Sequence, residues 1–146
     1  PTDAFLFSFA RESATIRYLR LDAADGDKTL RVVKSYLAAG FVMAFGFAVP
    51  SSLTAESDIS YRPQFDSICG GQAVLAVGYD DNRRIASDTG ALLFRGSWGA
   101  AWGEQGCGWL PYNFVRNQFA VDFWTVLRQD WAAAGTLSNP TLIMDA

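Results

Sequence analysis

Few residues of this chain could carry out covalent chemistry. Its 146 residues include no histidine and two cysteines, Cys69 and Cys107. A cysteine thiol becomes a strong nucleophile when a neighbouring base or positive charge favours the thiolate, and histidine is the usual base. Every mechanism in which histidine acts as base, acid or metal ligand is therefore closed to this chain acting alone.

The two cysteines leave two interpretations open. They are too few for a disulfide framework and lack the close spacing of a zinc or redox motif. A single Cys69–Cys107 disulfide is one alternative, and two free, mostly buried thiols are the other.

The composition excludes several classes of protein. Half of the residues are apolar and 14% are aromatic, which is enough for a real core. The net charge is −3 and no basic cluster is present, so nucleic-acid binding is not expected. The chain also has no phosphate-binding or dinucleotide-binding glycine motif. We expect no cofactor.

Four polar residues offer a calcium site as an alternative to a solvated hairpin. They are Asp80, Asp81, Asn82 and Asp88. Their spacing is not that of an EF-hand loop, so the hairpin is the preferred interpretation and no metal site is predicted.

The segment 35–55 has no charged residue and approaches the length of a membrane span. Gly40 and Pro50 interrupt it, however, and its first part continues an amphipathic pattern that starts at Leu30. We interpret it as the end of a helix followed by a buried strand. The chain also shows no basic-then-apolar leader, so we expect a soluble protein without contact with a membrane, in a compartment that the sequence does not assign.

The order of elements predicts an α+β domain. A helix is expected from Asp27, its N-cap, to Gly40, its left-handed cap, because Leu30, Val33 and Leu37 recur at helical spacing. The remaining segments predict strands with mostly short connections, arranged as an antiparallel, partly closed sheet or half-barrel beside one main helix. The expected strands are 15–21, 41–49, 72–79, 91–95 and 109–112, with a loop at 50–67, a polar connection at 80–90, a long turn at 98–108, one helical turn at 113–117 and an apolar segment at 121–127.

Three segments resemble a known family. Residues 70–80 read GGQAVLAVGYD, residues 94–108 read FRGSWGAAWGEQGCG, and residues 109–112 with 122–124 continue the likeness. Together they resemble the C-terminal half of papain-like cysteine peptidases, whose motifs are G-H-A-V-x-x-V-G-Y and N-S-W-G-x-x-W-G-E-x-G-Y-G. The resemblance covers residues 28–127. It implies a single half-domain over 1–146, with a lead-in strand and loop at 1–27 and a tail at 128–146.

The chain departs from the family at the positions that carry catalysis. Gln72 stands at the position of the catalytic histidine, and an amide does not titrate near neutral pH. Gly96 stands at the position of the asparagine that orients this histidine. The nucleophile motif C-G-[SA]-C-[WY] does not occur in this chain. Cys69 does not match the nucleophile by position, and Cys107 replaces a tyrosine of the motif.

The neighbouring aromatic residues have two interpretations each. The resemblance makes Ser97 and Trp98 a structural pair, and Trp98 becomes a core residue once its usual partners are gone. Trp102 and Trp109 could bind a peptide or a sugar by stacking, although packing in the core or at its rim is the simpler role.

The sequence therefore predicts a non-catalytic papain-like module that binds a protein or peptide. Half of a two-part fold would expose apolar surface, so we expect self-association or a partner chain that covers it. One alternative is a fragment or subunit of a working cysteine peptidase whose nucleophile lies on another segment or chain. A second alternative is a structural or assembly module.

Overall fold

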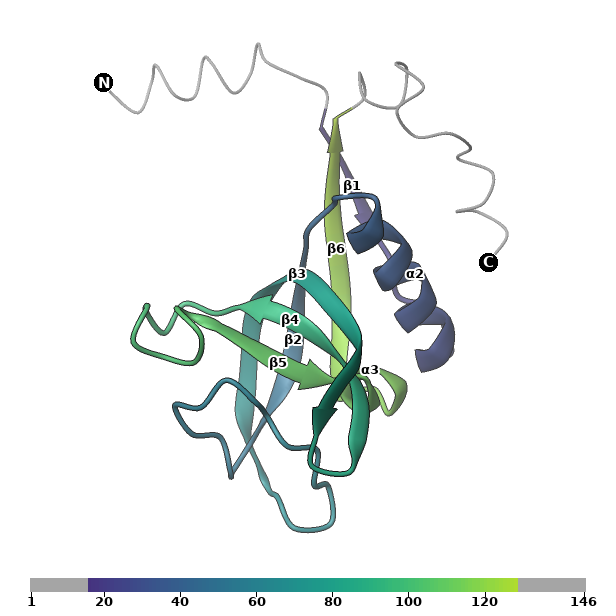
Figure 1. Cartoon of the computed structure of the whole chain (residues 1–146). Coiled ribbons are helices and arrows are strands. Elements are labelled where there is room, and N and C mark those ends of the chain that lie inside the picture. The colour runs from purple at the N-terminus through teal and green to yellow at the C-terminus, as the bar shows by residue number, and fades with distance from the viewer. Residues whose placement is uncertain (1–15, 129–146) are drawn as a thin grey trace, which may run out of the picture. The chain divides into compact units, whose positions relative to one another are not determined.

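The computed structural model describes residues 16–128, which fall into two compact units. Residues 20–125 form one unit, and the described ends 16–19 and 126–128 belong to the other. The elements are β1 (Ile16–Arg20), α2 (Gly26–Ala38), β2 (Met43–Pro50), β3 (Ile68–Ile85), β4 (Asp88–Arg95), β5 (Cys107–Pro111), α3 (Tyr112–Arg116) and β6 (Ala120–Arg128), as Figure 1 shows. The expected tail from residue 129 lies outside the described residues.

The strands form one sheet in the order β1-β6-β2-β3-β4-β5. The pairs β2–β3, β2–β6, β3–β4 and β4–β5 are antiparallel. The sheet is not closed into a barrel, and α2 is the main helix. The predicted α+β fold with an antiparallel sheet is therefore confirmed.

Buried and more exposed residues alternate along β2, which shows the two faces of the sheet. Met43, Phe45 and Phe47 are buried, whereas Ala44 is exposed and Gly46 is half-buried. Successive side chains of a strand point to opposite faces, so every second residue enters the core.

Aromatic side chains from distant segments fill this core. Phe45 stacks on Phe123 of β6 with ring centroids 4.7 Å apart, and Phe47 lies 5.6 Å from Phe94 of β4. Phe47 also meets Phe114 of α3 edge to face. Rings in these geometries contribute beyond the area that they bury.

Helix α2 begins two residues earlier than its sequence suggests. The N-cap is Asp25, whose carboxylate accepts the main-chain N–H of Asp27 at 3.0 Å. The prediction of Asp27 as the cap was therefore wrong, because two aspartates with the same capping chemistry lie close together. Gly40 follows the helix with a φ of 88°, as predicted.

The uncharged segment 35–55 holds the end of α2 and the strand β2, as the interruptions predicted. None of the helices among residues 16–128 is long and apolar enough to cross a bilayer.

The expected polar connection 80–90 is instead the outer part of a long hairpin. Strands β3 and β4 stay paired as far as Ile85 and Asp88, with irregularities in the register between Asp80 and Arg84. The polar composition reflects the exposure of the hairpin and not a lack of pairing, because an antiparallel pair can be solvated on one face.

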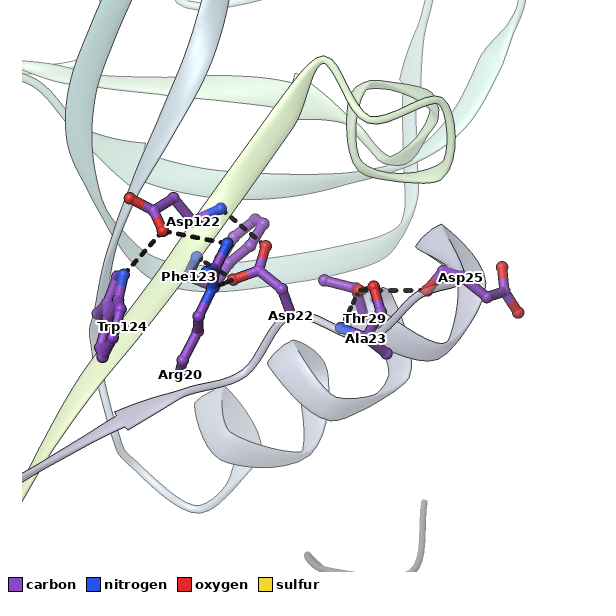
Figure 2. Close-up of polar contacts among 8 residues, drawn as sticks. All are labelled: Arg20, Asp22, Ala23, Asp25, Thr29, Asp122, Phe123 and Trp124. Carbon is purple, nitrogen blue, oxygen red and sulfur yellow. Dashed lines mark hydrogen bonds and ion pairs between the residues drawn. The ribbon is translucent and has the colours of Figure 1, made fainter.

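Asp22 joins the start of this unit to β6 by hydrogen bonds (Figure 2). Its carboxylate accepts the main-chain N–H groups of Asp122 at 2.7 Å and Phe123 at 2.9 Å. Asp122 has a φ of 65° at an irregularity in the β2–β6 register. The two N–H groups there are turned away from β2 and are satisfied by the aspartate.

Candidate functional site

Gln72 lies in β3 opposite Phe47 of β2. The strand continues with buried Val74 and Ala76, which anchor it in the core. The side chain of Gln72 is half-buried, and its Nε2 donates to the main-chain oxygen of Ala73 at 3.3 Å. An amide in this position can donate or accept a hydrogen bond, but it cannot remove a proton from a thiol.

Gly96 directly follows β4, at the same end of the hairpin as Gln72. The pair Leu75–Arg95 is the last aligned pair at this end of the β3–β4 ladder. One step further in the same antiparallel register, Gly96 lies opposite Val74, which is two residues from Gln72. The position that the resemblance assigns to a catalytic base is thus on β3, and the position of its orienting residue directly follows the neighbouring strand β4.

The ring of Trp98 takes the space beside Gly96. A Cβ atom on Gly96 would lie 2.7 Å from Trp98 Cε3 and 3.0 Å from Cζ3. Real Cβ contacts are longer, so any side chain at this position requires Trp98 to move. The asparagine of the family motif does not fit here without rearrangement.

Trp98 and Trp102 form one aromatic group with Phe94. The two indole rings are 4.4 Å apart, and Phe94 lies 5.9 Å from Trp102. Trp102 Nε1 donates to the main-chain oxygen of Thr54 at 2.9 Å. The ring and the N–H of Trp102 are therefore engaged by the chain itself.

Trp109 is engaged in a second cluster. The guanidinium of Arg83 lies over its ring at 4.7 Å, and its Nε1 donates to Glu104 at 3.4 Å. Arg83 also lies 2.6 Å from Asp58 and 3.4 Å from Glu104. The hydrogen bond from Trp109 lowers the pKa of Glu104, with further contributions from Ser57 and Arg83. The cluster ties β3, β5 and the loop before β3 together.

Both cysteines are free, so the alternative of a Cys69–Cys107 disulfide is not formed. Cys107 is half-buried, but Cys69 is exposed, and the expectation of two mostly buried thiols is wrong for Cys69. The residues next to Cys69 in the sequence did not indicate this exposure. It follows from the position of Cys69 as the second residue of β3, where the first residues of the strand are exposed.

The acidic residues of the hairpin have partners from other elements. Asp81 lies 2.5 Å from Lys34 Nζ of α2 and accepts the hydroxyl of Tyr112 at 2.7 Å. Asn113 donates to Asp88. Among residues 16–128, no group of three or more cysteine, aspartate or glutamate side chains is arranged for a metal ion.

One face of the strands β2, β3 and β6 is lined mainly by small and apolar residues, with the charged side chains of Asp122 and Arg20 beside its Trp124, and we call it the open face. The register aligns Gly46 with Ala73 and with Val121, and it aligns Ala44 with Leu75 and with Trp124. Paired residues share a face, and none of these side chains is buried. The open face consists of Ala44, Gly46, Ala48, Gly71, Ala73, Leu75, Val121 and Trp124.

The open face contains a hollow of about 430 Å³. Small residues leave this volume, because five of the eight strand residues that line it are glycine or alanine. The lining residues are Gly46, Phe47, Ala48, Gly70, Gly71, Gln72, Ala73, Gln118, Phe119 and Val121, and none is charged. Gln72 thus borders an uncharged hollow. The sequence predicted an exposed apolar surface but not its place.

Comparison with known proteins identifies related sequences and structures. No protein-family profile matches the chain. The uncharacterized peptidase C1-like protein L477 of Acanthamoeba polyphaga mimivirus is 29% identical over 126 residues, which are 80% of this chain and 39% of that protein. Xylellain, a cysteine protease from Xylella fastidiosa, is 33% identical with a TM-score of 0.67, over 88% of this chain and 45% of that one.

A more distant structure shares the fold alone. The clostridial cysteine protease Cwp84 is 24% identical with a TM-score of 0.52, over 80% of this chain and 30% of that one. The chain thus spans less than half the length of each of these three relatives. Over most of its own length it has the fold of the papain-like cysteine peptidases and is homologous to them.

Proposed function

We propose that this chain is a non-catalytic papain-like module that acts by binding a protein or peptide. The observation that carries the proposal is the pairing of an amide at Gln72 with a side-chain-free Gly96 whose space is filled by Trp98. The homology provides the comparison, because these are the positions of the base and its orienting residue in the family motifs.

The chemistry of these positions argues against peptide hydrolysis. Removal of one member of a catalytic triad lowers the rate by several powers of ten. Here both residues that this half would supply are replaced, and the chain contains no histidine elsewhere. Cys69 lies three residues before Gln72 on β3, at an irregularity in the β2–β3 register, and it does not match the family nucleophile by position.

The open face supports binding as the alternative role. Its side chains are apolar and uncharged, and the hollow gives a partner a concave surface to fill. Large exposed apolar surfaces of soluble proteins are usually interaction sites.

The length of the relatives favours one other candidate. The chain covers 45% of xylellain and 39% of the mimivirus protein, so a nucleophile could be supplied by a separate segment or chain. Such an assembly would also have to replace the missing histidine, which makes it the second candidate.

Labelling with a thiol-directed peptidase inhibitor tests the proposal. We expect the exposed Cys69 to react no faster in the folded protein than in urea, because no base activates it. The variant Cys69→Ser identifies the thiol that reacts. Rapid stoichiometric labelling that requires the folded chain would contradict the proposal and favour the peptidase subunit.

A further inference from the structure

The strand β5 stands at one end of the sheet, beside β4, and its outer edge is occupied by other parts of the chain. The main-chain N–H and oxygen of Cys107 both bond to the main chain of Glu104. Two residues further along, Trp109 donates its N–H to the oxygen of Ser57 at 2.7 Å and accepts the N–H of Ile59 at 3.0 Å. An edge strand pairs readily with other extended segments, and here the chain itself supplies that segment.

Residues 54–59 supply this segment, and we call them the strap. The strap lies beside β5 as a short parallel partner, with Asp58 opposite Trp109. Its first part is held at the turn before β5, where the main-chain oxygen of Ala55 accepts the N–H of Gly103 at 2.9 Å. The strap therefore contacts β5 as an added strand would, through main-chain hydrogen bonds.

The side chains of the strap add a specific pattern to these main-chain bonds. The carboxylate of Asp58 accepts a hydrogen bond from the Arg83 guanidinium at 2.6 Å, and the hydroxyl of Ser57 donates to Glu104 at 3.1 Å. The next side chain, Ile59, is buried. An acidic residue followed by an apolar one is thus what this edge accepts from its own chain.

The contacts that close the strap are of the kind that opens locally. The side chains of Arg83 and Asp58 are 30% and 39% exposed, and an ion pair with this exposure is weak. Ala55 and Glu56 are exposed, and the strap borders a second, polar hollow of about 230 Å³ within its own loop. Segments with few buried apolar contacts and exposed hydrogen bonds open at a small cost in free energy.

The receiving side is held in place by contacts outside the strap. The guanidinium of Arg83 lies over the ring of Trp109 at 4.7 Å and 3.4 Å from Glu104. The N–H groups of Gly108 and Leu110 face β4, because successive N–H groups of a strand point to opposite sides. The edge and its cation are therefore ordered before a ligand arrives, which reduces the entropy that binding costs.

We propose that the edge of β5 is a binding site for an extended peptide, and that the strap occupies this site until such a peptide displaces it. The strap indicates the chemistry of the peptide. It runs parallel to β5, with an acidic side chain towards Arg83 and an apolar side chain at the buried place of Ile59. The inference goes beyond the proposed function and does not depend on it, since β4 separates β5 from the strands of the open face.

Amide hydrogen exchange of the full chain, followed by NMR, tests whether the strap opens. Asp58→Lys reverses one charge of the ion pair and should speed the exchange of the Trp109 N–H at least about tenfold. Glu56→Lys is the matched control, because it makes the same change of charge at an exposed position of the strap. The N–H groups of Gly108 and Leu110 should stay protected in both variants, since β4 holds them.

A synthetic peptide with the sequence of residues 54–60, TAESDIS, tests the edge as a binding site. Added to the Asp58→Lys variant of the chain, it should slow the exchange of the Trp109 N–H again, at least about threefold, because it binds only the folded edge. The same peptide with lysine in place of its aspartate keeps the main chain and should have no effect, since it meets Arg83 with a like charge.

Three results would overturn the inference. Equal exchange of Trp109 in Asp58→Lys and Glu56→Lys would show that the ion pair does not hold the strap. Exchange of Gly108 and Leu110 as fast as that of Trp109 would show that β5 unfolds together with the strap. No slowing by the peptide, or equal slowing by both peptides, would show that the edge does not select an acidic strand. Inhibitor labelling is measured separately, so each of these results leaves the test of the non-catalytic function unchanged.

Discussion

The carboxylate of Asp22 accepts the main-chain N–H of Asp122, which lies 100 positions further along the chain, at 2.7 Å. Its second oxygen accepts the N–H of Phe123 at 2.9 Å. Arg20 lies 3.2 Å from Asp22 and 3.4 Å from Asp122, and Trp124 Nε1 donates to Asp122 (Figure 2). One side chain thus holds the lead-in segment against the irregular part of β6.

Replacing Asp22 with alanine should lower the free energy of unfolding by about 1–3 kcal/mol, because two N–H groups lose their acceptor in a half-buried site. Asp22→Asn should cost less, since its amide keeps one oxygen. Urea unfolding followed by circular dichroism measures both differences.

Glu56→Ala is the control for Asp22, because Glu56 is an exposed residue elsewhere on the surface. It should change the free energy of unfolding by less than about 0.5 kcal/mol. An Asp22→Ala variant as stable as this control would show that water replaces the carboxylate without loss.

Acid should weaken the contact between α2 and the β3–β4 hairpin. The hydrogen bond from Lys34 lowers the pKa of Asp81 below its usual 3.8, and Tyr112 adds to the effect. A carboxylate with a lowered folded-state pKa stabilises the fold above its unfolded-state pKa, and this stabilisation is lost as the pH falls through the folded-state value. We therefore expect the stabilisation by Asp81 to be lost below about pH 4.

The variant Asp81→Asn tests this contribution. We expect its difference in stability from the parent chain to be present at pH 7 and to shrink below pH 4, as urea midpoints at several pH values would show. Since 53% of the Asp81 side chain is exposed, the difference should stay below about 1 kcal/mol. Glu56→Gln removes one negative charge elsewhere and serves as the control. A difference that is the same at pH 3 and pH 7 would contradict the prediction.

Local patterns predicted most elements of the fold but not their long-range contacts. The spacing of Leu30, Val33 and Leu37 indicated α2, and the apolar run 41–49 indicated β2, because both signals lie within one segment. The contact of Asp22 with Asp122 joins segments 100 residues apart, and no local pattern reports it.

The sequence likewise predicted one part of the candidate site and not the other. The motifs around Gln72 and Gly96 indicated the family and the replaced positions, since family motifs are local. The hollow could not be located from the sequence, because it arises where Gly46, Ala73 and Val121 from three strands align. That alignment depends on the sheet register and on the irregularity at Asp122.

Trp98 and a side chain at position 96 should compete for the same space. Gly96→Ala should lower the free energy of unfolding by about 1–3 kcal/mol, because its Cβ would meet the Trp98 ring at 2.7 Å. In the background of Trp98→Ala the same change should cost much less, and a double-mutant cycle in urea measures the coupling.

Gly71→Ala is the matched control for the Gly96 variant. The nearest atom to a Cβ at position 71 is Phe47 O at 3.9 Å, so this alanine fits without displacement. We expect its free energy of unfolding to stay within about 0.5 kcal/mol of the parent chain. Equal costs at positions 71 and 96, or no coupling with Trp98, would contradict the close packing beside Gly96.

Restoring a histidine should not restore peptide hydrolysis. In Gln72→His the imidazole would lack the orienting residue at Gly96, where Trp98 occupies the space. The exposed thiol of Cys69, three residues away on β3, does not match the family nucleophile by position. We therefore expect no turnover of a fluorogenic peptide above that of the parent chain. Turnover by Gln72→His that disappears when Cys69→Ser is added would show that this strand can place a thiol beside a base, and the non-catalytic function would have to be abandoned.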